Sequence, residues 1–149
     1  MIKKEEQNQM IQKAMNGYTV CFANQCPQHE QCLRWNVGQQ MPSDLKGCMC
    51  VNPHYEGTAT EHCPMFRSAE KVRQAKGMTH LFTDDMPQKV ETAIRNELIR
   101  RYNRTYYFEY RNGTRLIPPA MQEEIRTVCR QHGWTADVQF DEYIEDYDW

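Results

Sequence analysis

Six cysteines fall between residues 21 and 63, and this cluster constrains the fold more than any other feature of the chain. The spacing is Cys21-x4-Cys26-x5-Cys32, followed by Cys48-x-Cys50 and then Cys63. The surrounding segment, residues 18–66, holds four prolines and few periodic apolar runs. A segment that is too short of apolar side chains to build a core usually needs a cross-link. We therefore expect a loop-rich module in which the cysteines supply that link.

The context of the cysteines disfavours disulfides. The first residues, MIKKEEQNQMIQKAM, carry charges where a secretory signal has a continuous apolar stretch. No run approaches the ~20 apolar residues of a membrane-spanning helix. We therefore expect a cytoplasmic protein with no membrane partner, and such a compartment keeps thiols reduced. The odd total of seven cysteines also fits complete pairing poorly.

Zinc is the cross-link that the sequence favours. Zinc takes four thiolate or imidazole ligands in a tetrahedron, usually from C-x2–4-C pairs, and only the first gap here lies in that range. An iron–sulfur cluster, which also takes four thiolates, is the alternative, and partly buried thiols without a metal are a third interpretation. Six cysteines and three histidines (His29, His54 and His62) compete for about four ligand positions.

Several pieces of the chain resemble a known family: CPQHEQCLR, CVNP, HCPMFR, YYFEYRNGTRLIPP and FDEY. They are similar to an uncharacterised bacterial family of short cysteine-cluster proteins, known only as a domain of unknown function, over most of the chain beyond residue 18. The resemblance implies that Cys26, Cys32 and Cys63 belong to the cysteine pattern of the family, with Cys21 as the fourth member. We take these four as the expected metal ligands and keep Cys48, Cys50 and His62 in reserve. The family implies no activity, substrate or partner.

The rest of the chain predicts an α+β fold, in which a cysteine module packs on helices and a β-hairpin. We expect an N-terminal helix in residues 1–17, the cysteine-rich module in 18–66, a helix-helix-hairpin-helix body in 67–140 and an acidic tail in 141–149. The helices of the body are expected at 68–77, 86–103 and 118–133, with Cys129 in the core. The hairpin is expected at 105–117 around Asn112-Gly113, and a last strand at 136–140, because apolar residues repeat with the matching periods.

A basic, aromatic stretch, RRYNRTYYFEYRNGTR, offers a second possible function. It places Arg100, Arg101, Arg104, Arg111 and Arg115 among five aromatic residues. Arginines bind phosphates and aromatic rings stack on bases, so this stretch is a candidate nucleic-acid surface. The competing interpretation is a solvated helix face next to a hairpin whose Tyr106, Phe108 and Tyr110 enter the core. Six acidic residues after residue 130 weaken the nucleic-acid interpretation.

No catalytic motif is present. The chain has no phosphate-binding glycine loop, no H-E-x-x-H and no zinc-deaminase pattern, although a Cys–His pair can meet in space from distant positions. The sequence therefore predicts a zinc-stabilised binding or interaction module without catalysis, with protein or nucleic acid as its partner. The alternatives are an iron–sulfur or thiol redox protein or sensor, and a nucleic-acid-binding protein.

Overall fold

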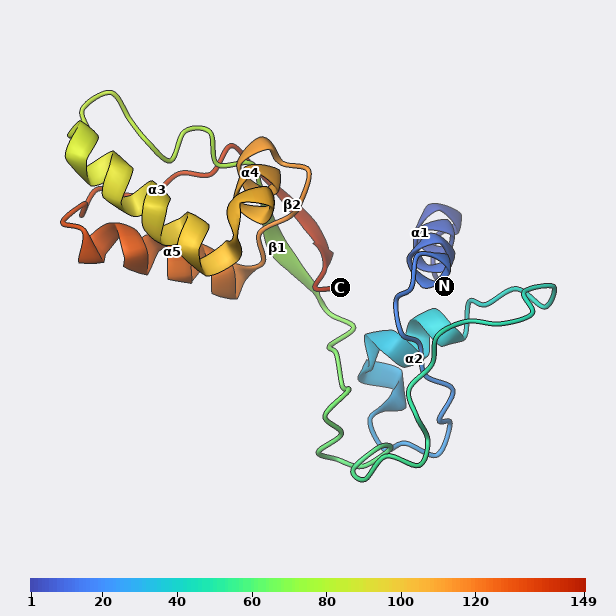
Figure 1. Cartoon of the computed structure of the whole chain (residues 1–149). Helices are drawn as coiled ribbons and strands as arrows, with labels where there is room; N and C mark the ends of the chain where they lie inside the picture. Colours follow the sequence, from blue (N-terminus) through green and yellow to red (C-terminus); the bar gives the residue numbers. More distant parts are fainter. The chain divides into compact units, whose positions relative to one another are not determined.

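The computed structural model describes all residues from 1 to 149 and has an α+β fold (Figure 1). It contains five α-helices, one short 3-10 helix and one two-stranded sheet. The chain divides into two compact units. Unit 1 is made of residues 1–70 together with 147–149, and unit 2 is made of residues 71–146. None of the helices combines the length and the apolar character that crossing a membrane requires.

Unit 1 joins short helices to a long loop. Helix α1 (Lys4–Met15) buries Met10 and Ala14, the 3-10 helix η1 covers His29–Gln31, and α2 covers Leu33–Gly38. Residues 39–70 contain no helix and no strand beyond isolated pairings, and Figure 1 shows part of this segment as an extended loop. The buried core of unit 1 is small and consists of Met10, Ala14, Val20, Leu33, Val37 and Tyr147.

The end of the chain, predicted to be an acidic tail, contains strand β2 (Glu142–Tyr147) and two packed aromatic residues. The hydroxyl of Tyr147 donates a hydrogen bond of 2.5 Å to Glu6. The Trp149 ring lies edge-on to Tyr18 and to Tyr147, with centroid distances of 5.3 and 5.4 Å. Tyr147 and Trp149 therefore complete the core of unit 1.

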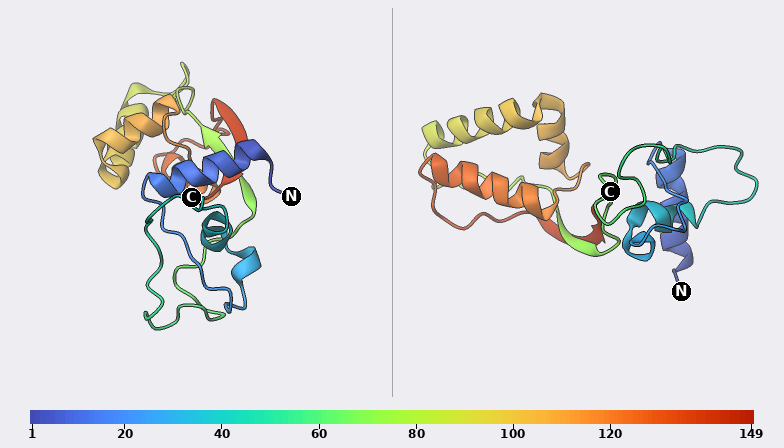
Figure 2. Two further views of the ribbon diagram at one scale, coloured as in Figure 1. Left: turned by 90° about the vertical axis from the view of Figure 1, so that its right-hand side faces the viewer. Right: turned by 90° about the horizontal axis from the view of Figure 1, so that it is seen from below.

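Unit 2 is built from three helices and a sheet. Strand β1 (Lys71–Lys76) pairs with β2 in an antiparallel sheet. Helices α3 (Gln88–Tyr102) and α5 (Pro119–Gln131) lie side by side in Figures 1 and 2, α4 (Arg104–Asn112) follows α3, and α5 packs on β1. Buried Gln122 of α5 donates hydrogen bonds of 2.9 Å to the carbonyl oxygens of Arg73 and Ile117, which fixes α5 against the backbone around β1.

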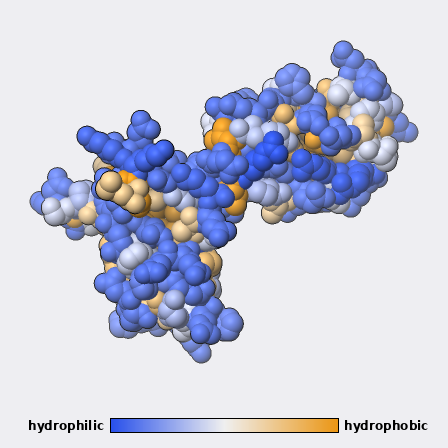
Figure 3. All heavy atoms as spheres, turned by 180° about the vertical axis from the view of Figure 1, so that it is seen from behind, coloured by the Kyte–Doolittle hydropathy of each residue, from blue (hydrophilic) through white to orange (hydrophobic).

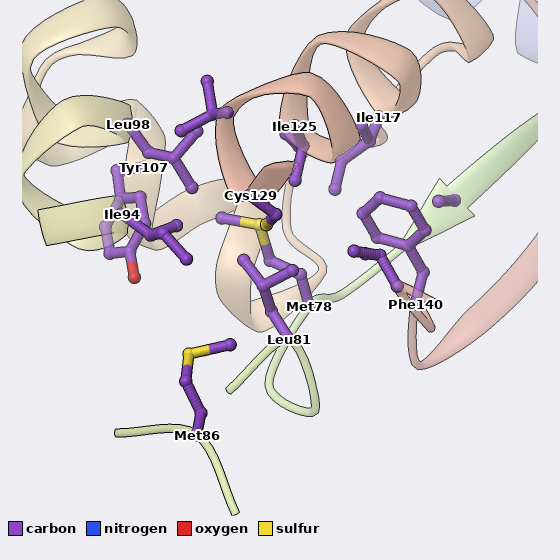
Figure 4. Close-up of a cluster of buried hydrophobic side chains, with 13 residues drawn as sticks. Met78, Leu81, Met86, Ile94, Leu98, Tyr107, Ile117, Ile125, Cys129 and Phe140 are labelled. Atoms are coloured by element: carbon purple, nitrogen blue, oxygen red, sulfur yellow. The ribbon is translucent and has the colours of Figure 1, made fainter. Parts of the chain in front are cut away.

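The core of unit 2 is larger and continuous (Figure 4). Ile94 and Leu98 of α3 face Ile125 and Cys129 of α5, and residues of the 77–87 loop and the 133–141 segment cover them. Cys129 is fully buried, which confirms its predicted place in the core. Burial raises the pKa of its thiol to about 11, so this cysteine is a packing residue. Hydrophilic residues cover most of the face of the molecule seen in Figure 3.

The hairpin predicted at 105–117 is wrong, because most of this segment forms helix α4. Asn103 begins the helix with a positive φ of 63°, and its side chain accepts a hydrogen bond of 3.0 Å from the backbone N–H of Tyr106. Gly113 ends the helix in the left-handed region, at a φ of 81°. Asn and Gly both tolerate a positive φ, and both hairpin turns and helix ends need this conformation. The Asn112-Gly113 dipeptide therefore does not distinguish a hairpin from a helix end.

The alternation of aromatic residues was also misleading. Tyr106 and Phe108 are exposed, whereas Tyr107, between them, is fully buried in the core of unit 2. Tyr110, three residues after Tyr107, packs against the same core. The spacing of three residues between Tyr107 and Tyr110 matches the period of a helix. The alternation of Tyr106, Phe108 and Tyr110 combines residues from the exposed face and the buried face of that helix.

The helix predicted at 68–77 and the strand predicted at 136–140 are wrong as well. Residues 71–76 form β1, and the last strand lies at 142–147. Strand β1 is stabilised by partners far away in the sequence: β2 on one side, and Ile117, whose N–H and carbonyl exchange hydrogen bonds of 2.8 and 2.9 Å with Ala75. Such pairing overrides a weak local helix preference.

Candidate metal centre

Four cysteines of unit 1 line one small cavity of about 20 Å³, which we call the cysteine cavity. They are Cys21, Cys26, Cys32 and Cys63, the four ligands expected from the sequence. Cys26 and Cys32 are buried, and Cys21 and Cys63 are partly buried. The fold thus gathers thiols that span 43 positions of the sequence around a single hollow.

The backbone of Cys21 contacts helix α2 near both of its ends. Its backbone N–H donates a hydrogen bond of 2.9 Å to the carbonyl oxygen of Arg34. A Cβ atom on Gly38 would lie only 2.4 Å from the Cys21 carbonyl oxygen. Glycine at position 38 therefore allows the helix backbone to approach the backbone of Cys21 this closely.

Cys26 and Cys32 stand at the two ends of a tight turn that contains η1. The N–H of His29 donates to the Cys26 carbonyl at 3.2 Å, and the N–H of Cys32 donates to the His29 carbonyl at 3.0 Å. The His29 ring also lies edge-on to Trp35, with a centroid distance of 4.6 Å. Both rings line the cysteine cavity, so the turn and its aromatic pair form one wall.

Two long side chains attach the Cys63 loop to the rest of the cavity. The Nε2 atom of Gln28 donates to the carbonyl oxygens of Thr60 and Glu61, at 3.1 and 2.7 Å. The guanidinium of Arg34 donates to the carbonyl oxygens of Met65, at 2.8 Å, and Thr19, at 2.9 Å. The contacts with Thr60, Glu61 and Met65 join segments about thirty positions apart in the sequence and bring the Cys63 loop to the cavity that the other three cysteines line.

The surroundings of Cys21 oppose ionisation of its thiol. Burial raises the pKa of Cys21, and the nearby Cys32, Cys26 and Cys63 raise it further. Arg34, whose guanidinium lies over the Tyr18 ring at 5.0 Å, is the one cationic side chain other than histidine in the cavity lining. A bound metal cation would reverse this balance, because it favours thiolates strongly.

The side chains are not arranged for coordination as they stand. No group of three or more His, Cys, Asp or Glu side chains is placed to hold a metal ion, and all seven cysteines are free thiols. The reserve ligands lie outside the cavity. Cys48 packs against the core of unit 1, Cys50 is exposed, and His62 is exposed in the turn before Cys63.

The five arginines of the candidate nucleic-acid surface are largely engaged. Arg100 and Arg101 both bond to Glu97, at 2.7 and 2.8 Å, and these bonds lower the pKa of Glu97 to about 2. Arg115 pairs with Glu109 at 2.8 Å, and Arg104 lies over the Phe108 ring. Arg111 is exposed at the end of α4. Because three of the five face carboxylates, the surface offers much less free positive charge than the sequence suggests.

A family model matches residues 1–149, the whole chain. The chain belongs to DUF6078, a family of unknown function. No curated protein and no solved structure matches it. Membership of DUF6078 brings no activity, so the chemistry of the cysteine cavity has to be argued from its own residues.

In this DUF6078 protein, the sequence pointed to the cysteines but not to the residues that position them. Gln28, Arg34 and Gly38 each make a contact that depends on the tertiary fold. Gln28 and Arg34 lie in the piece CPQHEQCLR, yet nothing in that piece marks them as residues that position the cysteines. The one local signal is the glycine itself, since glycine is common at helix ends and α2 ends at Gly38.

Proposed function

We propose that unit 1 is a metal-binding module in which Cys21, Cys26, Cys32 and Cys63 hold one zinc ion. The observation that carries the proposal is the common cavity: four thiols from separate segments line one hollow. Four cysteines are a frequent ligand set of structural zinc. Such a set leaves no open position for a substrate, so the proposed role of the site is structural and the module acts through binding.

The size of the cavity favours a single ion. A volume of about 20 Å³ is close to the space that one water-sized sphere needs. An iron–sulfur cluster, with several iron and sulfide atoms, needs considerably more room. Zinc is therefore preferred over the cluster.

The loop of unit 1 provides the reason for a metal. Residues 39–70 contribute no fully buried side chain to the core of unit 1. Met41, Cys48 and Ala69 pack against it and are only partly buried, and Val51 is the one buried apolar residue of the loop. A metal bound by Cys63 and the three earlier cysteines would fasten this loop to the short helices. Structural zinc sites supply folding free energy directly, because the unfolded chain does not hold the metal in the same way.

Ligation requires the four sulfur atoms to converge, since they are not arranged around a common point. Rotation about one Cα–Cβ bond moves a cysteine sulfur between staggered positions. All four residues already border the cavity, so ligation requires only side-chain rotation in an unchanged fold.

Elemental analysis of untagged protein purified without oxygen tests the proposal. The expected result is about one zinc per chain, on the four-thiolate stoichiometry of structural zinc. Cys63→Ser should lose most of the metal, and Cys48→Ser, which removes a thiol outside the cavity, should retain it. Less than about a tenth of an equivalent of any metal in the wild type, or equal zinc in the wild type and Cys63→Ser, would overturn the proposal.

A further inference from the structure

The sheet of unit 2 ends at strand β2. The sheet has two strands, and β1 has a second neighbour on its other side, because Ala75 also bridges to Ile117. Residues 142–145 of β2 form no backbone hydrogen bond with any segment other than β1, so the second edge of β2 carries no strand (Figure 1). The N–H and C=O groups along such an edge can pair with a further extended chain.

The two strands of the sheet carry opposite charges. Strand β2, EYIEDY, holds three carboxylates and no basic residue, whereas β1, KVRQAK, holds three cations and no acidic residue. Strand β2 therefore already accepts a basic strand on its paired edge. Because successive side chains of a strand point to opposite faces, Glu142 and Glu145 lie on different faces of the sheet. A strand beside β2 would meet a carboxylate on each face.

The carboxylates of Glu142 and Glu145 are available to a partner. Both side chains are exposed, and neither forms an ion pair or a hydrogen bond. The guanidinium of Arg73 in β1 lies over the Tyr143 ring at 3.9 Å and pairs with neither carboxylate. Ile144, between the two carboxylates in the sequence, is partly exposed. The second edge of β2 thus offers two unpaired negative charges and one apolar side chain.

A second copy of the chain is a poor partner for this edge. Pairing two β2 strands would bring the carboxylates of both together without a basic residue in either strand, and like charges on neighbouring strands are destabilising. Charged side chains on an edge also discourage pairing with neutral strands. A basic strand would instead gain a favourable contact at each carboxylate. The charge of the edge therefore selects a basic occupant.

We propose that the free edge of β2 binds an extended segment of a partner protein, rich in lysine and arginine, which adds to the sheet as a third strand. Backbone hydrogen bonds hold the segment, and Glu142 and Glu145 select its basic side chains. The interface belongs to unit 2 and does not depend on the zinc site proposed for unit 1.

The test titrates the isotope-labelled full-length protein with a capped peptide of sequence KVRQAKG, that of residues 71–77. This probe has the charges of the strand that β2 already accepts. The expected result is a saturable shift of the amide NMR signals of residues 142–146, which weakens as salt is added. Two further peptides carry N-methyl groups on one or the other alternate set of backbone amides. One should bind like the parent peptide and the other should not bind, because a strand added at an edge donates through alternate amides.

Two double variants test the charge of the edge. Glu142→Gln combined with Glu145→Gln should weaken binding of the peptide at least about fivefold, since it removes two exposed ion pairs. The matched control, Glu56→Gln combined with Asp84→Asn, removes two exposed carboxylates outside β2 and should leave binding unchanged.

Equal binding of the parent and both methylated peptides would show attraction by charge without strand pairing, and would overturn the proposal. Unchanged signals of residues 142–146 in a large excess of peptide, or equal binding by the two double variants, would overturn it as well. Shifts of the same signals when the protein is concentrated without peptide would assign the edge to a second copy of the chain and contradict the basic partner.

Discussion

The Nδ1 atom of His29 lies 2.7 Å from the carbonyl oxygen of Cys26, across the turn that leads to Cys32. A carbonyl oxygen only accepts hydrogen bonds, so Nδ1 carries the proton and donates. The same ring packs edge-on against Trp35. His29 therefore stiffens the turn between two of the proposed ligands, and its contribution is one of positioning.

We expect His29→Ala to destabilise unit 1 by about 1–3 kcal/mol. The substitution removes the partly buried hydrogen bond to the Cys26 carbonyl and the ring contact with Trp35. Zinc binding should weaken with it, while the stoichiometry stays the same. Urea unfolding followed by tryptophan fluorescence, with a zinc titration alongside, measures both. His62→Ala, which removes an exposed histidine outside the cavity, is the control and should change neither. Loss of zinc in His62→Ala would show that the ligand set is wrong.

Gly38→Ala is expected to displace Cys21. The new Cβ would lie 2.4 Å from the Cys21 carbonyl oxygen, a backbone atom that cannot move aside alone. We expect a loss of about 1–3 kcal/mol in unfolding free energy and a lower zinc content, as for other overpacked positions. Gly47→Ala is the matched control, since a Cβ there meets no atom within 4 Å. If the two variants are equally stable, the close approach at Gly38 has no energetic importance.

Asp141 joins the loop after β1 to the segment before β2 in unit 2. Its carboxylate accepts hydrogen bonds from the Thr79 N–H and hydroxyl, at 3.0 and 2.7 Å, and from the His80 N–H and Nδ1, at 3.1 and 2.8 Å. Burial alone would raise the pKa of Asp141, but the bonds from Thr79 and His80 together outweigh burial and lower the pKa. Asp141→Asn should therefore destabilise unit 2 by about 1–2 kcal/mol, a range that allows for solvent screening.

The pH dependence of this contribution has a definite sign. Because the folded pKa of Asp141 is depressed, its stabilisation is present above the unfolded pKa of about 3.9 and is lost as the pH falls through the folded value. The difference in unfolding free energy between the wild type and Asp141→Asn should thus be constant at neutral pH and shrink below about pH 4. Urea titrations at several pH values measure it, with Asp137→Asn as the control. A difference that grows in acid would contradict the assignment.

The aromatic end of the chain is expected to matter for the stability of unit 1. Trp149→Ala removes ring contacts with Tyr18 and Tyr147 and the cation–π contact with Lys13. We expect a loss of about 1–3 kcal/mol and faster amide exchange in α1, because the core of unit 1 is small. Tyr55→Ala, which removes an exposed aromatic ring of the same unit, should have little effect. Unchanged exchange in α1 would rule out a structural role for Trp149.

Local periodicity predicted the helices well and the strands poorly. Helices α1, α3 and α5 form where the sequence places them, because their apolar residues repeat at helical spacing and pack on one core. Strand β1 was mistaken for a helix because its partners, β2 and Ile117, lie more than forty positions away. Helix α4 was mistaken for a hairpin because Tyr107, its buried residue, lies between two exposed aromatic residues.

The candidate site was partly readable from the sequence. The four expected ligands line one cavity, yet their role as ligands stays a prediction, because no group of side chains is placed to hold an ion. The positioning contacts of Gln28 and Arg34 join segments about thirty positions apart. Contacts of that kind depend on the folded backbone and leave no periodic trace in the sequence.

X-ray absorption spectroscopy at the zinc edge, on protein purified without oxygen, identifies the ligands of the proposed zinc ion. We expect zinc surrounded by four sulfur atoms at about 2.3 Å, with no nitrogen or oxygen bound to it. Cys48→Ser should give the same spectrum, and Cys63→Ser should lose the four-sulfur signal. Protein without zinc, or zinc with nitrogen ligands at about 2.0 Å, would contradict the four-cysteine site.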